Sequence, residues 1–288
     1  MEATKTAGTL VYHPEAHLAV SSQDVVYRRE GDREFLARIY QPEGPGPFPA
    51  MIAIHGGAWA NKEWLQNEES HRNLAEGGLV VTAVQFRTSL DAPHPLAQQD
   101  INYATRWLKA HAAEYNGSAE CVGGVGWSSG GHQVMLGAMR PRAYGDTPLP
   151  EAPDVDGTLG YVVLGWPVID PLARYRLMQD RGNDEVVGRH IAYFGDEAGM
   201  IEASPPHILE RGETVELPPV LLLQGANDES LPRMMSERFI ELYSLGGGVI
   251  EAGKYPGEPH GFMRNAGLQT SRAFAQAKSF IARVLAEH

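Results

Sequence analysis

The chain has 288 residues, of which 43% are hydrophobic and 21% are charged. That composition is typical of a folded globular protein, and the length allows one large domain with a substantial core. The chain carries 24 lysines and arginines against 36 aspartates and glutamates, so its net charge is −12. Because negative charge repels phosphate backbones and anionic lipid, the composition argues against nucleic acid and membrane surfaces as partners.

The single cysteine, Cys121, rules out an intrachain disulfide framework. The opening residues, MEATK, lead into polar sequence without the apolar run of a secretory signal. No stretch approaches the ~20 apolar residues that a membrane span requires. We therefore expect a cytoplasmic protein. Histidine and cysteine do not cluster with zinc-binding spacing, so we expect neither a metal nor another cofactor.

Strand-like and helix-like segments alternate along the chain, which predicts an α/β fold with a mostly parallel sheet flanked by helices. Residues 1–23 are expected to be an N-terminal extension, and residues 24–288 to form one domain. Residues 24–30 and 34–40 predict a hairpin that turns at Gly31-Asp32. Apolar and β-branched runs predict further strands at 50–54, 79–86, 121–125, 160–164, 220–224 and 249–255. Apolar spacings of three and four predict helices over 97–112, over 130–139 and around 274–284.

The chain between Asp170 and Val220 reads as irregular, with scattered aromatic residues and the pair Pro205-Pro206. An interruption of this length between two core strands is either a lid over the site or ordinary surface decoration. Residues 171–217 are therefore a candidate lid insertion.

Residues 126–131 read GWSSGG and stand directly after a predicted strand and before a predicted helix. A G-x-S-x-G tract in that context is typical of the nucleophile elbow, a turn so tight that small residues must flank the serine. Ser129 is a competing hydroxyl, but it lies one position late in the pattern, and its backbone amide is the more useful group. Ser128 is the predicted nucleophile.

An earlier predicted strand ends abruptly at residues 55–59, which read HGGAW. Acyl transfer builds negative charge on a carbonyl oxygen, and preorganised backbone N–H groups must face that oxygen. Glycine lets the backbone approach the oxygen closely. We therefore expect the amides of Gly56, Gly57 and Ser129 to form an oxyanion hole.

A nucleophilic serine requires a histidine base and a carboxylate that orients it, in the chain order Ser, Asp or Glu, His. His260 follows the last predicted strand, and Asp228 follows the strand at 220–224. Both stand at carboxyl ends of strands, where α/β sheets carry their ligand sites. Asp170 is the main rival acid because it also follows a strand, and Glu229 is a lesser one.

Three further residues lie next to these motifs. Trp59 and Trp127 flank the predicted oxyanion loop and the nucleophile, and they either wall the substrate pocket or pack in the core. His132 follows the elbow glycines, close to the site but badly placed to reach Ser128.

Together, the HGGAW and GWSSGGH motifs and the Asp228 and His260 loops resemble the carboxylesterase branch of the α/β-hydrolases. The most similar groups are the hormone-sensitive-lipase-like and feruloyl-esterase-like enzymes, and the kynurenine formamidases share the H-G-G-x-W pattern. The resemblance extends over about residues 24–286 and includes Asp100, at a position that is commonly acidic in these relatives. Two residues depart from this pattern. Ala58 replaces the third glycine of the lipase-like motif, and Ser129 replaces the small residue that usually follows the nucleophile.

The resemblance implies an eight-stranded core and metal-free acyl transfer through an acyl-enzyme on Ser128. We expect a small-molecule carboxylic ester as the substrate. Three alternatives stay open: an aryl formamide or amide processed by the same triad, a peptidase, and a catalytically silent α/β-hydrolase that only binds a ligand. The sequence carries no signal for a particular oligomeric state.

Overall fold

The computed structural model describes residues 10–232 and 234–287 of the chain. Eight strands form one sheet in the spatial order β1-β2-β4-β3-β5-β6-β7-β8. The strands from β3 to β8 are parallel to one another, and β1 and β2 are antiparallel at one edge. The predicted mostly parallel sheet is confirmed. The strand bounds are β1 Val20–Glu30, β2 Arg33–Pro42, β3 Phe48–Ile54, β4 Val80–Val84, β5 Gly117–Trp127, β6 Tyr161–Gly165, β7 Val220–Gly225 and β8 Ile250–Tyr255.

The hairpin at the sheet edge is also confirmed, with Glu30 paired to Arg33 across the predicted turn. β1 begins at Val20, so residues 20–23 belong to the sheet and not to the predicted N-terminal extension. These residues are mostly polar and exposed, and their strand arises from pairing with β2, which local composition does not reveal. Residues 1–9 of the predicted extension lie outside the described residues.

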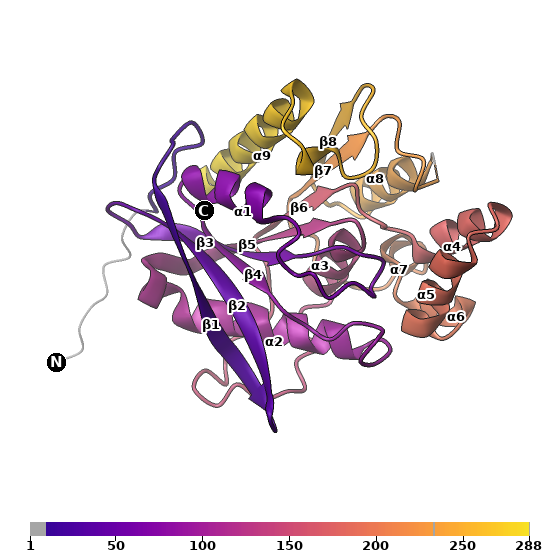
Figure 1. The fold of residues 1–288 in the computed structure, drawn as a ribbon, viewed down its shortest axis with the longest axis horizontal. Coiled ribbons are helices and arrows are strands. Elements are labelled where there is room, and N and C mark those ends of the chain that lie inside the picture. The colour runs from indigo at the N-terminus through magenta and orange to yellow at the C-terminus, as the bar shows by residue number, and fades with distance from the viewer. Residues whose placement is uncertain (1–9, 233, 288) are drawn as a thin grey trace.

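Helices cover both faces of the sheet (Figure 1). α1 and α9 pack on one face, while α2, α3 and α8 pack on the other. Within the described residues, no helix combines the length and apolar character that crossing a membrane requires. The bounds are α1 Glu68–Glu76, α2 Leu96–His111, α3 Ser129–Met139, α8 Met235–Leu245 and α9 Leu268–Ala286, with short 3-10 turns at Ala112–Tyr115 and Phe262–Arg264.

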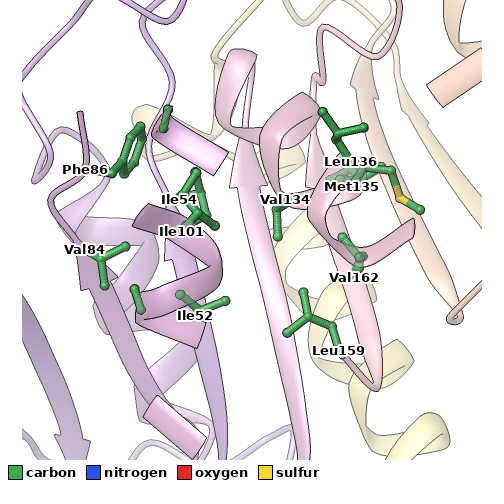
Figure 2. Packing of buried hydrophobic residues seen from close by; sticks show 14 of the residues in the cluster. Ile52, Ile54, Val84, Phe86, Ile101, Val134, Met135, Leu136, Leu159 and Val162 are labelled. Atoms are coloured by element: carbon green, nitrogen blue, oxygen red, sulfur yellow. The ribbon is translucent and has the colours of Figure 1, made fainter. Parts of the chain in front are cut away.

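Each face of the sheet has its own apolar core. Figure 2 shows one of them, where Ile52 of β3 packs with Ile101 of α2 and Val134 of α3. Met51, the neighbour of Ile52, lies in the opposite core with Phe280 of α9, because successive strand side chains point to opposite faces. Fully burying one such side chain contributes about 1.5–3 kcal/mol, so both cores stabilise the packing of the helices on the sheet.

Residues 171–217 contain four helices, so the prediction of an irregular segment is wrong. N-cap residues explain where three of these helices begin. The side chains of Asp170, Asn183 and Asp196 each accept a hydrogen bond from a backbone N–H in the first turn of the helix that follows. The prolines of the pair 205–206 occupy the first turn of the last helix, where a missing N–H costs nothing. The bounds are α4 Pro171–Asp180, α5 Asp184–Phe194, α6 Glu197–Glu202 and α7 Pro205–Glu210.

These four helices are anchored in the core. Tyr193, Met200 and Ala203 are fully buried and belong to the same apolar cluster as α2 and α3. Figure 1 shows α4, α5 and α6 gathered at one end of the molecule. The packing favours a fixed wall over a mobile lid.

Asp100 is a fully buried carboxylate on α2 that binds two arginines from other elements. It accepts from Arg28 of β1 and from Arg87, which follows β4. Arg87 donates Nη2 at 2.6 Å, Nε at 2.8 Å and its backbone N–H at 2.9 Å. Asp100 thus joins β1 of the edge hairpin to α2 and to the segment that follows β4, which gives the acidic residue at this position a structural reason.

Asp100→Ala is expected to lower the free energy of unfolding by about 3–5 kcal/mol, because two largely buried guanidinium groups lose their anion. Urea denaturation measures the change. Glu34→Ala is the matched control: it removes the exposed partner of Arg29, and should change stability by less than ~1 kcal/mol. Equal losses in the two variants would contradict the role given to burial.

Candidate active site

Ser128 forms the turn between β5 and α3, with φ 54° and ψ −120°. A non-glycine residue with positive φ is strained, and such strain persists only where the surroundings enforce it. Here the surroundings are glycines that admit no side chain. A Cβ on Gly126 would overlap the carbonyl oxygen of Gly130, and a Cβ on Gly130 would overlap that of Ile54. The chain therefore has the tight turn that the motif predicts.

Three predicted site residues meet at this turn. Ser128 Oγ lies 2.9 Å from His260 Nε2, and His260 Nδ1 lies 2.8 Å from Asp228 Oδ2. Because an ionised carboxylate only accepts, Nδ1 donates to Asp228, and Nε2 is left to accept from the Ser128 hydroxyl. Ser128 is 5% exposed and the Asp228 side chain 2%, so both hydrogen bonds are largely shielded from bulk water.

The loops after β7 and β8 bring Asp228 and His260 together. The backbone N–H of Asn227 donates to the carbonyl oxygen of Glu258 at 2.9 Å. The two loops lie so close that a Cβ on Gly225 would overlap the same carbonyl oxygen. Asp228 and His260 therefore lie on two loops that are hydrogen-bonded to each other.

Gln224, at the end of β7, holds the carboxylate of Asp228 and is absent from the sequence predictions. Its Nε2 donates to Asp228 Oδ2 at 2.7 Å, and the N–H of Ser230 donates to Oδ1 at 2.9 Å. Oδ2 therefore accepts from both Gln224 and His260, which orients the carboxylate. A glutamine inside the apolar strand VLLLQG is the available signal, because a polar side chain there needs a partner.

The two rival acids lie elsewhere. Asp170 caps α4, where Oδ1 accepts from the N–H of Ala173 at 3.1 Å and Oδ2 pairs with Arg238 at 2.7 Å. Glu229 offers its backbone carbonyl to an arginine of the α4 region. Among the hydrogen bonds of the described residues, neither rival carboxylate reaches His260.

The loop after β3 passes directly over the elbow. A Cβ on Gly56 would lie 2.5 Å from the carbonyl oxygen of Trp127 and 3.0 Å from Ser128 Cβ. Residues 57–59 all have positive φ, at 118°, 51° and 59°. Glycine at position 57 takes up that backbone freely, whereas Ala58 and the residue after it do so under strain.

The amides predicted to bind an oxyanion are unpaired. Among residues 10–232 and 234–287, no protein acceptor is hydrogen-bonded to the N–H of Gly56, Gly57 or Ser129. Unpaired N–H groups beside a nucleophile are what an oxyanion hole requires. The oxyanion role of these residues stays a prediction.

Both tryptophans that were candidates for the pocket wall are buried. Trp59 is 2% exposed and Trp127 1%. The Trp59 indole stacks on Tyr193 of α5, and Trp127 stacks on Trp166, which follows β6. These contacts favour the packing role over the pocket wall.

Two arginines from the α4 region support the loop that carries Asp228. Arg174 Nε donates to the carbonyl oxygen of Ser230 at 3.3 Å, and Arg181 donates to that of Glu229. Burial lowers the pKa of Arg174 to about 10, while the Asp228 carboxylate favours its charged form. The guanidinium is therefore still a cation at neutral pH and adds positive charge near the carboxylate.

The arrangement combines a hydroxyl, a base that accepts its proton, a carboxylate that orients the base, and unpaired amides beside the hydroxyl. These are the parts that nucleophilic acyl transfer needs. Within the described part of the chain, His, Cys, Asp and Glu side chains form no group of three or more that could hold a metal ion.

A model of the BD-FAE family matches residues 38–243 of the chain. The match is more than half of the chain and contains the oxyanion loop, the elbow and Asp228. It ends before His260.

Curated relatives include ester hydrolases of Mycobacterium tuberculosis. The chain is 26% identical over 298 residues to the probable carboxylic ester hydrolase LipM, and this alignment covers 98% of this chain and 65% of LipM. It is 23% identical over 250 residues to the esterase LipI, and this alignment covers 85% of this chain and 76% of LipI. Hormone-sensitive lipase of Bos taurus is 27% identical over 41% of this chain, but this is only 16% of the lipase. The chain thus spans less than two thirds of the length of LipM and of the lipase.

Solved structures show the same fold. Thermogutta terrifontis esterase with propionate bound has a TM-score of 0.72 and 22% identity, covering 93% of this chain and 94% of that one. Esterase B of Lactobacillus rhamnosis has a TM-score of 0.75 and 20% identity, covering 95% and 90%. At these identities the likeness establishes the α/β-hydrolase fold. With this fold and with a family match over most of its length, the chain belongs to the BD-FAE family.

Proposed function

We propose that this chain is a serine hydrolase that cleaves small carboxylic esters, with Ser128 as the nucleophile, His260 as the base and Asp228 as the orienting acid. The observation that carries the proposal is the unbroken pair of hydrogen bonds from Ser128 through His260 to Asp228, at 2.9 and 2.8 Å. Membership of the BD-FAE family and the ester hydrolases among the relatives support the same reaction class.

The reaction proceeds in two halves through an acyl-enzyme. His260 removes the proton of Ser128 as the oxygen attacks the ester carbonyl, and Asp228 stabilises the imidazolium that forms. The imidazolium then protonates the leaving alcohol. In the second half the same histidine activates a water molecule, which attacks the acyl-enzyme and releases the acid.

Each half passes through a tetrahedral intermediate with negative charge on the former carbonyl oxygen. The amides of Gly56, Gly57 and Ser129 donate to this oxygen. Because the donors are part of the folded backbone, they need little reorganisation when the charge develops.

Short acyl groups are the substrates that we infer. The similar Thermogutta terrifontis esterase has been solved with propionate and with butyrate bound. The two short acids bound to that protein support a narrow acyl pocket.

Ser128→Ala is expected to lower kcat by about 10⁴–10⁶, because the nucleophile is lost while the fold is kept. A fluorophosphonate probe, which labels activated serines, should no longer react with this variant. Ser129→Ala is the control and should still be labelled. If Ser129→Ala lost the label and Ser128→Ala kept it, the assigned nucleophile would be wrong.

Asp228→Asn is expected to lower kcat by about 10³–10⁴, because the amide favours the wrong imidazole tautomer. Asp170→Asn is the matched control, since it changes an equally buried carboxylate that is paired with Arg238. The control should lower kcat by less than about tenfold. The comparison is made on p-nitrophenyl acetate, and the reverse ranking would transfer the acid role to Asp170.

A series of p-nitrophenyl esters tests the acyl pocket. Each methylene that fits should add up to ~0.8 kcal/mol of burial to the transition state, and the gain should stop when the pocket is full. We expect kcat/KM to rise with chain length and to fall by about six carbons. A value that still climbs at about twelve carbons would indicate an open lipase groove. Faster cleavage of N-formylkynurenine than of every ester would favour the formamidase alternative.

A further inference from the structure

Trp59 joins the oxyanion loop to the nucleophile helix. Its backbone N–H donates to Ser129 Oγ at 3.2 Å, and its indole Nε1 donates to His132 Nδ1 at 3.3 Å. Among the hydrogen bonds of the described residues, these two are the only ones that connect residues 55–61 to α3. Trp59 therefore links the loop to the nucleophile helix, in addition to the close backbone contact of Gly130 with Ile54 and His55.

The loop needs such support because its backbone is strained. Strained non-glycine residues typically cost about 1–3 kcal/mol each, and residues 58 and 59 both have positive φ. The carbonyl oxygen of Gly57 accepts from the N–H groups of Ala60 and Asn61 at 3.1 and 3.2 Å. Those bonds shape the turn from within, but they do not set its distance from Ser128.

The Ser129 hydroxyl is well placed to set that distance. Ser129 is buried at the first position of α3, immediately after the nucleophile. A hydroxyl oxygen has two lone pairs, so it accepts from the Trp59 N–H whichever way its own proton points. One residue thus offers its amide to the proposed oxyanion and its side chain to the loop that carries the other amides.

The second bond from Trp59 has a defined proton arrangement. His132 Nε2 donates to the carbonyl oxygen of Ala203 at 2.8 Å, so Nδ1 is the acceptor for the indole. Burial lowers the pKa of His132 to about 3. The ring stays neutral above that pH, and this contact therefore does not vary over the neutral range.

We propose that the Ser129 hydroxyl is a positioning group for ester hydrolysis, which holds Trp59 so that the amide of Gly57 faces the same oxygen as the amide of Ser129. This role rests on the proposed function and adds a residue to it. Without the hydroxyl, the Trp59 N–H is buried without an acceptor, and the strained loop relaxes away from the elbow. Because the amides bind the transition state more strongly than the ester, the loss falls on kcat.

Ser129→Ala is expected to lower kcat about tenfold and to leave KM within about twofold. The inhibition constant of a trifluoromethyl ketone, which mimics the tetrahedral intermediate, should rise by the same factor of about ten. This loss in kcat is smaller than the ~10²–10³-fold loss that follows removal of an oxyanion donor, because the donors are displaced and not deleted. Ser70→Ala is the matched control, because Ser70 is also a buried serine in a helix and its hydroxyl has no partner among the described residues.

Ser129→Thr and Ser129→Val separate the hydroxyl from the volume of the side chain, since the two variants have nearly the same shape. The threonine variant should keep most of the activity and the valine variant should behave like alanine. Equal kinetics for threonine and valine would overturn the proposal. The proposal would also be overturned if KM for the ester rose about tenfold while kcat stayed unchanged, because this indicates a loss of ground-state binding.

A different result is expected if the proposed serine hydrolase activity itself is wrong. A wild-type protein that neither hydrolyses esters nor reacts with a fluorophosphonate would overturn the proposed serine hydrolase, and the role of Ser129 with it. If the wild type is active and Ser129→Ala is as active as Ser70→Ala, only the positioning role is wrong.

Discussion

The turn at Ser128 is the constraint on which the rest of this structure depends. Three backbone segments meet there so closely that glycine is required at positions 56, 126 and 130, because a Cβ at each would approach a carbonyl oxygen to 2.5 Å or less. Packing of β5 against β3, and of α3 against the sheet, brings these segments together. The positive φ of Ser128 accompanies that closeness, and the Ser128 hydroxyl lies within hydrogen-bond distance of His260.

The remaining members of the proposed triad depend on the order of the parallel strands. β5, β6, β7 and β8 are neighbours in the sheet, so their carboxyl ends lie in a row along one edge. Ser128 follows the first of these strands, Asp228 the third and His260 the fourth. Trp166, which follows the second, stacks on Trp127 and lies edge-on to His260. A large rigid ring therefore occupies the end of β6, between the strand ends that precede Ser128 and Asp228.

The helices of residues 171–217 brace both halves of the site. Arg174 of α4 binds the loop that carries Asp228, while Tyr193 of α5 stacks on Trp59 in the oxyanion loop. A third contact runs from Ala203 through His132 to the same tryptophan. The same segment therefore contacts both the loop that carries Asp228 and the glycine loop at residues 55–59.

The features that the sequence by itself determined are those set by local backbone geometry: the strands of the sheet, the helices α2, α3 and α9, the edge hairpin, the elbow and the glycine loop. Glycine spacing and apolar periodicity carry these features because each depends on residues close together in the chain. The helices α1 and α8 and the four helices of residues 171–217 were not predicted. Which of Asp228 and Asp170 contacts His260 was decided only by the tertiary structure, since both follow strands: Asp228 is hydrogen-bonded to His260, whereas Asp170 is paired with Arg238. The buried position of Trp59 and the bond to the Ser129 hydroxyl were decided in the same way. Both depend on contacts between segments far apart in the sequence, which a local pattern does not encode.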